Sequence, residues 1–362
     1  MKPDIPAHMA GVQLVSHGDF DQLVYRTDIP VPQPAAGEVL IRVAAAGMNN
    51  TDINTRVGWY AKSVRGATGE TATQSDENEG GSWSGAAMEF PRIQGLDCCG
   101  TIVTAGENVD ADRIGERVLV RPMQALHDPD HPFAFVTFGS EMDGAFAQYA
   151  KVASQQALAV NSDWSDIELA SLPCAYSTAE NMLTRASVGA ERVLITGASG
   201  GVGSAAIQLA KRRGAEIMAV AAKAKASDVT DLGADQVIYR GQSVLEALGT
   251  NSVDVVVDLV GGSQWSDLCE ILRVGGRYVT SGAIAGPIVE LDLRTLYLKD
   301  LTFYGSTHQP DEIFTDLIDY VEHDEFRPVV ARTFPLTDIV IAQQEFLAKR
   351  HTGKLVLVPP AD

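Results

Sequence analysis

The chain of 362 residues is long enough for two domains, and 45% of its residues are apolar, an ordinary fraction for a globular protein. Its net charge of −19 opposes binding to nucleic acid or anionic membranes, because their phosphates would be repelled. No apolar run approaches the ~20 residues that span a bilayer. The N-terminus lacks the cationic and apolar regions of a signal peptide, so we expect a cytoplasmic location.

The first part of the chain, residues 11–160, contains short apolar runs separated by Gly, Pro and Asp, which predicts a compact, mostly β domain. Residues 62–89 are different, because they are rich in Gly, Ser, Thr and Glu and lack periodic apolar residues. We expect a long loop there, which is either a passive surface insertion or a wall over the active site.

The predicted strands of the mostly β domain are 12–18, 38–47, 98–106, 116–122 and 146–152.

From residue 190 onward, short apolar strands alternate with helical segments. Alternation at this spacing predicts a doubly wound parallel sheet. A further helix is predicted at 313–323 and a further strand at 353–359. The predicted strands of the sheet are 192–196, 216–221, 236–239, 254–260, 277–283 and 301–307, and its predicted helices are 201–214, 225–233, 243–249 and 263–276.

A glycine-rich turn follows the first of these strands, in the sequence TGASGGVG. It has the spacing of the GxGxxG fingerprint, with Ala in the first position. The glycines permit a tight turn and a close approach of the backbone to a pyrophosphate, and the following helix supplies free N–H groups. The turn therefore predicts dinucleotide binding, the alternative being a tight turn without a ligand. The expected contacts are Ala198, Ser199, Gly200, Gly201, Val202 and Gly203.

The residue about 20 positions later distinguishes NAD from NADP, because an acidic side chain there would bind the ribose 2′-OH of NAD. That acid is absent, and Lys223 and Lys225 follow the second strand instead. A lysine can pair with a 2′-phosphate, so the sequence favours NADPH, with Lys223 as a contact. Tyr239 and Arg240, after the third strand, point to the same adenosine end. The alternatives are a solvated helix start for the lysines and a capped strand for Tyr239 and Arg240.

Four segments of the chain carry a family resemblance: GASGGVG, GMNNTD followed by Arg56, Gly58 and Tyr60, then DGAFAQY, and HTGKLVL. They make the chain resemble the medium-chain dehydrogenase/reductase superfamily, and within it the zinc-free quinone oxidoreductase group. The resemblance covers nearly the whole chain outside residues 62–89. It implies an α/β protein in which a Rossmann domain, residues 161–308, lies between two parts of a GroES-like substrate domain, residues 1–160 and 309–362. It also implies a homodimer.

Zinc-dependent members of this superfamily carry Cys-His where this chain has Asn49-Asn50, and Gly-His-Glu where it has residues 95–97. Their third ligand falls on Cys174. Neutral amides and a leucine do not bind Zn²⁺, which prefers thiolate, imidazole or carboxylate. We therefore expect an enzyme that works without a metal, rather than a zinc alcohol dehydrogenase with atypical ligands.

Without a metal to stabilise an alkoxide, the expected substrates are those that delocalise charge themselves. Quinones and activated alkenes, such as an enone, an enal or an enoyl thioester, accept hydride from NADPH in this way. The alternative is an NADPH-binding protein with little turnover and a redox-sensing or structural role. A pure binder would need neither Asn49 nor Tyr60.

The resemblance also implies roles for individual residues. Asn49 would line the nicotinamide and substrate pocket, although its amide could instead satisfy local backbone. Asp52 would fix the loop by accepting backbone N–H groups, and Tyr60 would donate a hydrogen bond to the developing oxygen or form an aromatic wall. The remaining expected cofactor contacts are Val260, Ser281, Gly282, Ala283 and Lys354, of which Lys354 would reach a phosphate or lie in a charged loop.

Overall fold

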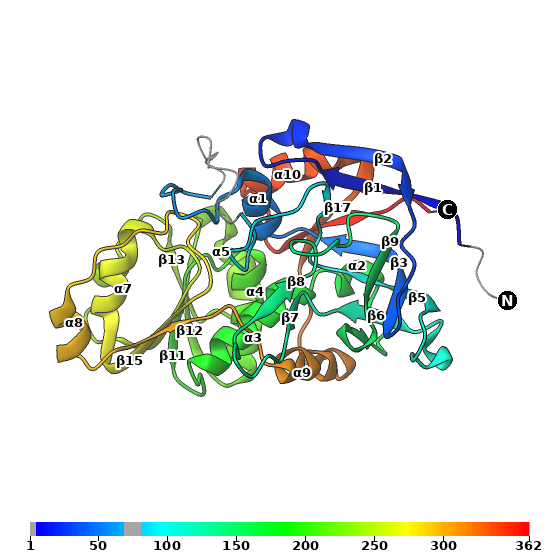
Figure 1. The fold of residues 1–362 in the computed structure, drawn as a ribbon. Coiled ribbons are helices and arrows are strands. Elements are labelled where there is room, and N and C mark those ends of the chain that lie inside the picture. The colour runs from blue at the N-terminus through cyan, green and yellow to red at the C-terminus, as the bar shows by residue number, and fades with distance from the viewer. Residues whose placement is uncertain (1–4, 69–80, 362) are drawn as a thin grey trace.

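The computed structural model of the protein describes residues 5–68 and 81–361. It has an α/β architecture in which a six-stranded sheet flanked by helices lies beside a mostly β part (Figure 1). The predicted fold class is therefore confirmed. In the described part of the chain, every helix is too short or too polar to cross a lipid bilayer.

The six-stranded sheet is entirely parallel, with the order β13-β12-β11-β14-β15-β16. This order places the third, second and first strands before the fourth, fifth and sixth, as in dinucleotide-binding folds. In β11, Val193 and Ile195 pack on one face of the sheet and Leu194 on the other. Burial of both faces explains why the central strands of the sheet are continuous apolar runs. The strands are β11 (Arg192–Ile195), β12 (Glu216–Ala221), β13 (Gln236–Tyr239), β14 (Val253–Asp258), β15 (Leu272–Thr280) and β16 (Thr302–Gly305).

Two helices around this sheet, at residues 173–185 and 293–298, were not predicted from the sequence. The other helices follow the prediction except at residues 263–276. The helix there ends at Ile271, and β15 begins at Leu272, whose backbone is extended and whose side chain is fully buried. Gly275, at a φ of 74°, then allows the register shift that lets Arg277 pair with the neighbouring strand. The helices are α3 (Pro173–Arg185), α4 (Gly201–Arg212), α5 (Ala226–Asp231), α6 (Val244–Leu248), α7 (Trp265–Ile271), α8 (Leu293–Leu298) and α9 (Asp311–Glu322).

The mostly β part contains a seven-stranded sheet in which β3 pairs with β5, β9 and β18. Two of its strands, β17 and β18, follow the six-stranded sheet in the sequence, so the chain returns to this part. The predicted domain boundaries near residues 160 and 308 stay predictions. The strands are β3 (Glu38–Gly47), β5 (Cys99–Ala105), β6 (Arg117–Val120), β9 (Tyr149–Ala153), β10 (Ala157–Ala159), β17 (Val330–Pro335) and β18 (Lys354–Val358), with β1 (His8–Leu14), β2 (Leu23–Pro30) and β4 (Arg92–Ile93) in a second sheet and β7 (Met123–Ala125) and β8 (Phe135–Thr137) in a third.

Three further helices belong to this part: α1 (Asn50–Val57), α2 (Asp166–Leu169) and α10 (Ile339–Ala348). Helix α1 directly follows β3, and the chain runs from the end of α10 into β18. Since the end of β3 is hydrogen-bonded to β18, the start of α1 lies close to β18. They form one side of the cavity described below.

Candidate active site

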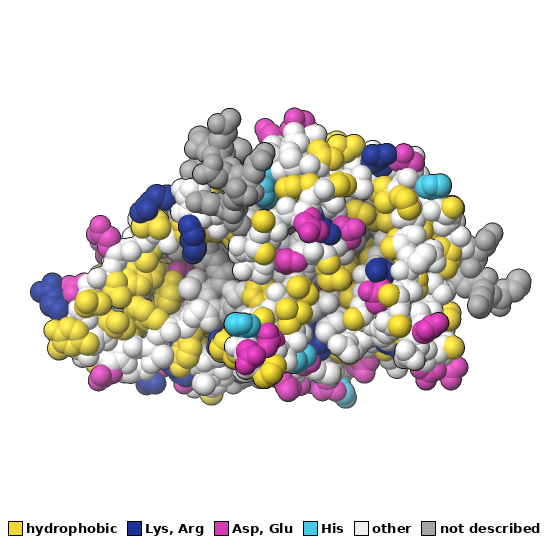
Figure 2. Space-filling view, in the orientation of Figure 1, with side chains coloured by type: hydrophobic (Ala, Val, Ile, Leu, Met, Phe, Trp, Pro, Cys, Tyr) yellow, Lys and Arg dark blue, Asp and Glu magenta, His cyan; other side chains and the backbone are white. Residues whose placement is uncertain are grey.

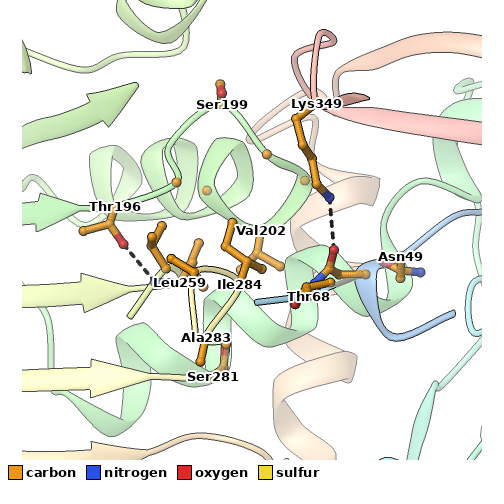
Figure 3. Close-up of a pocket in the computed structure, with 18 of the residues that line it drawn as sticks. Asn49, Thr68, Thr196, Ser199, Val202, Leu259, Ser281, Ala283, Ile284 and Lys349 are labelled. Carbon is orange, nitrogen blue, oxygen red and sulfur yellow. Dashed lines mark hydrogen bonds between the residues drawn. The ribbon is translucent and has the colours of Figure 1, made fainter. Parts of the chain in front are cut away.

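A cavity of about 470 Å³ lies between the carboxyl ends of the parallel strands and the segments around α1 and β18. In Figure 3, Thr196 lies at one end of the view and Asn49 at the other, with Val202, Ala283 and Ile284 between them. A ligand site at this edge of the sheet, where the strand order reverses, is the general rule for open α/β sheets.

The glycine-rich turn forms one wall of the cavity. A Cβ atom at Gly203 would lie 2.3 Å from the carbonyl oxygen of Gly197, so only glycine permits this close approach of turn and helix. Helix α4 begins at Gly201, and its first N–H groups have no partner within the helix. The turn residues that line the cavity are Thr196, Gly197, Ser199, Gly200, Gly201, Val202 and Gly203.

Ala198 was predicted with these residues but does not line the cavity. Its side chain is fully buried, and its N–H donates to the carbonyl oxygen of Val220 at 3.2 Å. It therefore supports the turn from within the sheet. The close approach and the free helix N-terminus fit a pyrophosphate, which needs backbone N–H groups and little side-chain bulk.

Two residues that the sequence did not single out, Thr196 and Asp258, organise the same edge of the sheet. The Thr196 hydroxyl donates to the Asp258 carboxylate at 2.5 Å and accepts the N–H of Leu259 at 2.9 Å. Asp258 also accepts the N–H groups of Val260 and Gly261. The turn that carries Val260, a predicted cofactor contact, is thus held by a buried carboxylate. The sequence signal that could have identified Asp258 is an acidic residue at the end of a predicted buried strand.

At the adenosine end, the structure differs from the prediction. Lys223 is exposed, with its ammonium over the ring of Tyr239, and neither residue lines the cavity. Lys225 and Arg240 line it instead. The reason is a 3-10 turn after β12, which carries Lys223 outward and Lys225 inward.

Lys225 belongs to a cluster of basic groups. Its ammonium donates to the carbonyl oxygens of Lys349, at 2.8 Å, and His351. Burial and the nearby Arg240 lower the pKa of Lys225. Burial and the Lys225 charge lower the pKa of Lys349 to about 8 and that of His351 to about 4. All four side chains line the cavity, although the Lys349 ammonium donates to Asn50 Oδ1 at 3.0 Å and a His351 with this pKa is neutral at pH 7. The positive charge that can accept an anion at this end is therefore that of Lys225 and Arg240.

At the opposite end, Asn49 precedes α1 and its side chain is bonded at both polar atoms. The amide Nδ2 donates to Asp97 Oδ2 at 2.9 Å, and Lys354 Nζ donates to Asn49 Oδ1 at 2.5 Å. Lys354 Nζ also lies 2.8 Å from Asp97 Oδ2. The Lys354 ammonium therefore faces Asn49 and Asp97, and its expected contact with a phosphate stays a prediction.

Asp52 and Tyr60 complete this end of the cavity. Asp52 accepts the backbone N–H of Asn49 at 2.7 Å, as predicted, but it lies behind the cavity wall. Burial raises its pKa to about 7. Tyr60 lines the cavity, and burial raises its pKa to about 12, so its hydroxyl is neutral and able to donate at pH 7.

The remaining predicted contacts lie on the wall formed by the ends of β14 and β15. Ser281, Gly282 and Ala283 all line the cavity, as does Val260. The described ends of the 62–89 segment reach this wall, because the N–H of Thr68 donates to the carbonyl oxygen of Ile284 at 3.1 Å. Trp83 also lines the cavity, whereas residues 69–80 lie outside the described residues.

Comparison with known proteins gives concordant matches along the chain. Residues 35–162 match the alcohol dehydrogenase GroES-like domain, residues 193–270 the NAD dependent epimerase/dehydratase family, and residues 232–357 the zinc-binding dehydrogenases. The crystal structure of a provisionally named alcohol dehydrogenase from Sinorhizobium meliloti 1021 is 46% identical, with a TM-score of 0.89 and 98% of both chains covered.

Two curated relatives match at lower identity. Acryloyl-coenzyme A reductase from Sulfurisphaera tokodaii is 28% identical over 92% of this chain and 95% of its own length. Quinone oxidoreductase from Lama guanicoe is 26% identical over 97% of both chains. These relatives carry different names, so the comparison shows the family rather than the substrate.

The zinc named in one family description does not fit the residues found here. Across residues 5–68 and 81–361, no three His, Cys, Asp or Glu side chains are grouped so that they could hold a metal ion. Among these residues, Cys174 is the single cysteine at this place, and the nearby Asp97 carboxylate is already paired with the Lys354 ammonium. Zinc requires deprotonated or neutral electron-pair donors in a tetrahedral set.

The dinucleotide, by contrast, fits the turn and helix N-terminus described above. The strand order, the glycine-rich turn and the family matches over both parts of the chain agree with one another. The protein therefore belongs to the medium-chain dehydrogenase/reductase superfamily and is an oxidoreductase with a nicotinamide-dinucleotide-binding fold.

Proposed function

We propose that this protein is a zinc-independent, NADPH-dependent reductase that transfers hydride to a quinone or to an activated alkene such as an enone, an enal or an enoyl thioester. The observation that carries the proposal is the end of the cavity around Asn49, where an ammonium, an amide and a neutral phenol stand in place of a metal site. Such groups can hydrogen-bond an oxyanion whose charge the substrate delocalises. The names of the acryloyl-coenzyme A reductase and quinone oxidoreductase relatives agree with these substrate classes.

The preference for NADPH is supported by the basic cluster at the adenosine end. Strand β12 ends at Ala221 and Ala222 follows it, and neither residue offers a carboxylate to a ribose 2′-OH. Lys225 and Arg240 line the cavity next to them. A 2′-phosphate at this end would meet positive charge and no acid, which favours the phosphorylated cofactor.

In the proposed reaction, bound NADPH supplies a hydride. The N–H groups at the start of α4 would hold the pyrophosphate, and the wall of Val260, Ser281, Gly282 and Ala283 would border the nicotinamide. Asn49 and Tyr60 would face the reacting oxygen, where the Tyr60 hydroxyl donates a hydrogen bond. Asp52 would hold the backbone of Asn49 in place through its 2.7 Å contact.

We also propose that the protein forms a homodimer. Strand β16 pairs with β15 on one side only among the described strands, and the neighbouring helix α8 exposes large apolar side chains. An unpaired sheet edge beside exposed apolar residues is suited to association with a second copy. The exposed residues are Leu293, Tyr297 and Leu298.

The test of the proposed activity follows NADPH absorbance with chelator-treated protein. The panel contains 1,4-benzoquinone, phenanthrenequinone, an enone, an enal, an enoyl thioester and a simple ketone, each with NADPH and with NADH. Turnover of a quinone or alkene that survives chelation and is faster with NADPH supports the proposal. Loss of activity on chelation, or activity with the ketone alone, would contradict it, and NADPH binding without turnover would favour the binding protein.

The NADPH preference has its own test in Lys225→Met. Loss of a charge-assisted contact to the 2′-phosphate should weaken NADPH binding by about 10- to 100-fold and leave NADH binding unchanged. Lys223→Met is the matched control, because that lysine is exposed and outside the cavity. Equal effects of both changes on NADPH binding would contradict the assignment of Lys225.

A further inference from the structure

Lys354 carries a positive charge into the interior of the protein. Its side chain is 4% exposed, and the carboxylate with which it pairs, that of Asp97, is 0% exposed. Asp97 Oδ2 accepts from both Lys354 and Asn49, and Asp97 Oδ1 accepts the N–H of Cys174 at 2.6 Å. The carboxylate therefore has three donors, and Asp97 is not among the residues that line the cavity.

The ammonium of this pair is differently placed. Lys354 lines the cavity with Asn49 and Cys174, whereas Asp97 does not. An ammonium has three N–H donors, and Lys354 uses two of them, on Asn49 Oδ1 and Asp97 Oδ2. One donor is left without a protein acceptor among the described residues.

Folding stability does not explain why a buried charge is present at Lys354. A buried ion pair contributes little net stability, because the loss of hydration offsets the attraction, and apolar side chains of the same volume would serve at least as well. The position of Lys354 is also fixed, since a Cβ atom at Gly201 would lie 2.7 Å from Lys354 Cδ. Its stem thus packs against the turn that begins α4, so the charge is held in one place.

We propose that Lys354 is a catalytic residue whose ammonium binds the oxyanion that develops on the substrate, with Asp97 and Asn49 as its positioning residues. The inference rests on the proposed function and assigns Lys354 to the substrate rather than to a cofactor phosphate. A cation that is already held in place stabilises developing negative charge without reorganisation. It would do here what a metal ion does at the same place in a zinc-dependent enzyme.

The step balances without loss of the lysine proton. A hydride adds to the β-carbon of an enone, and the electron pair of the carbon–carbon double bond moves through the carbonyl group to its oxygen. The Lys354 ammonium donates a hydrogen bond to that oxygen and stays protonated. A proton delivered from solvent then forms the new C–H bond at the α-carbon, and the carbonyl group is restored.

The test uses Lys354→Met together with the double variant Lys354→Met/Asp97→Asn. The single change leaves an unpaired buried carboxylate, which can prevent folding, whereas the double variant removes both charges with little change in volume. With an enone that the wild type reduces, we expect kcat to fall about 100- to 1000-fold. The Kd for NADPH, measured by fluorescence, should be unchanged. Lys211→Met, which removes an exposed lysine paired with Asp235 at 2.9 Å, should leave both quantities unchanged.

A second arm separates chemistry from structure. In Lys354→Ala, added ethylammonium should restore part of kcat in proportion to its concentration, because it returns a cation to the vacated space. A double variant with wild-type kcat would overturn the inference, as would weakened NADPH binding with kcat unchanged, which would return Lys354 to the phosphate. Failure of the proposed function is visible separately, as absence of turnover in the wild type, and the inference would fall with it.

Discussion

Asp52 shows how one buried carboxylate can set the response of the protein to pH. It is fully buried and accepts the N–H of Asn49, and burial raises its pKa from 3.8 to about 7. Between these two values the folded protein binds more protons at this group than the unfolded chain does. Stability contributed by Asp52 is therefore present below about pH 4 and is lost as pH rises through about 7.

The prediction at this scale concerns Asp52→Asn. The amide has an oxygen that can still accept the N–H of Asn49 and cannot ionise, so we expect the variant to gain stability relative to the wild type as pH rises from 4 to 7. The gain scales as about 1.4 kcal/mol for each unit of pKa displacement. Urea unfolding at pH 5 and pH 8 measures it. The exposed Asp316→Asn is the control, and parallel pH profiles for Asp52→Asn and the wild type would contradict the prediction.

Among the structural elements, the strand–turn–helix unit of β11 and α4 combines a strong sequence signal with a tight steric requirement. A Cβ atom added to Gly203 would lie 2.3 Å from the carbonyl oxygen of Gly197. The contact joins backbone to backbone, so no side chain can move aside. Any substituent at this position must push the turn away from the helix, and with it the N–H groups at the pyrophosphate site.

We therefore expect Gly203→Ala to weaken NADPH binding by at least about 10-fold, which corresponds to the loss of one or two hydrogen bonds. Gly189→Ala is the matched control, because nothing lies within 4 Å of its added Cβ. Fluorescence titration of both variants gives the dissociation constants, and thermal unfolding shows whether each is folded. If Gly203→Ala bound NADPH as the wild type does, the turn would not be the pyrophosphate site.

The features that could not be predicted from the sequence lack a local apolar pattern. Helix α1 buries five polar residues beside Ile53 and Val57, so a single apolar pair is all the periodic signal that its sequence carries. The buried polar residues are Thr51, Asp52, Asn54, Thr55 and Arg56. The regular strands of the parallel sheet were predictable because their apolar runs are local. The partners of Lys354 and of Thr196 were not, since Asp97 and Asp258 are far from them in sequence and meet them only after folding.

At the scale of the whole molecule, apolar side chains gather on one end of the surface, over α7 and α8 (Figure 2). Leu293, Tyr297 and Leu298 are 60% to 67% exposed, and they lie near the edge strand β16. A monomer would leave this apolar surface in water next to unpaired backbone groups. Association of two copies through the edge removes both costs.

Leu298→Glu should therefore shift the protein from dimer to monomer, because a carboxylate in the contact would lose its hydration. Analytical ultracentrifugation measures the mass of each species. Ile341→Glu, an exposed apolar residue on α10, is the control and should leave the mass unchanged. A wild type that sediments as a monomer would remove the basis for the proposed dimer.

The return of the chain to its first sheet has a consequence for biosynthesis. The six-stranded sheet is complete once residue 305 has been made, whereas β3 lacks its neighbour β18 until residue 358. Lys354 joins Asn49 and Asp97 only at that moment. A nascent chain can thus hold a folded cofactor half while its first-made strands still wait for a partner. Ribosome pausing or premature termination between these points would leave an incomplete sheet for chaperones to shield.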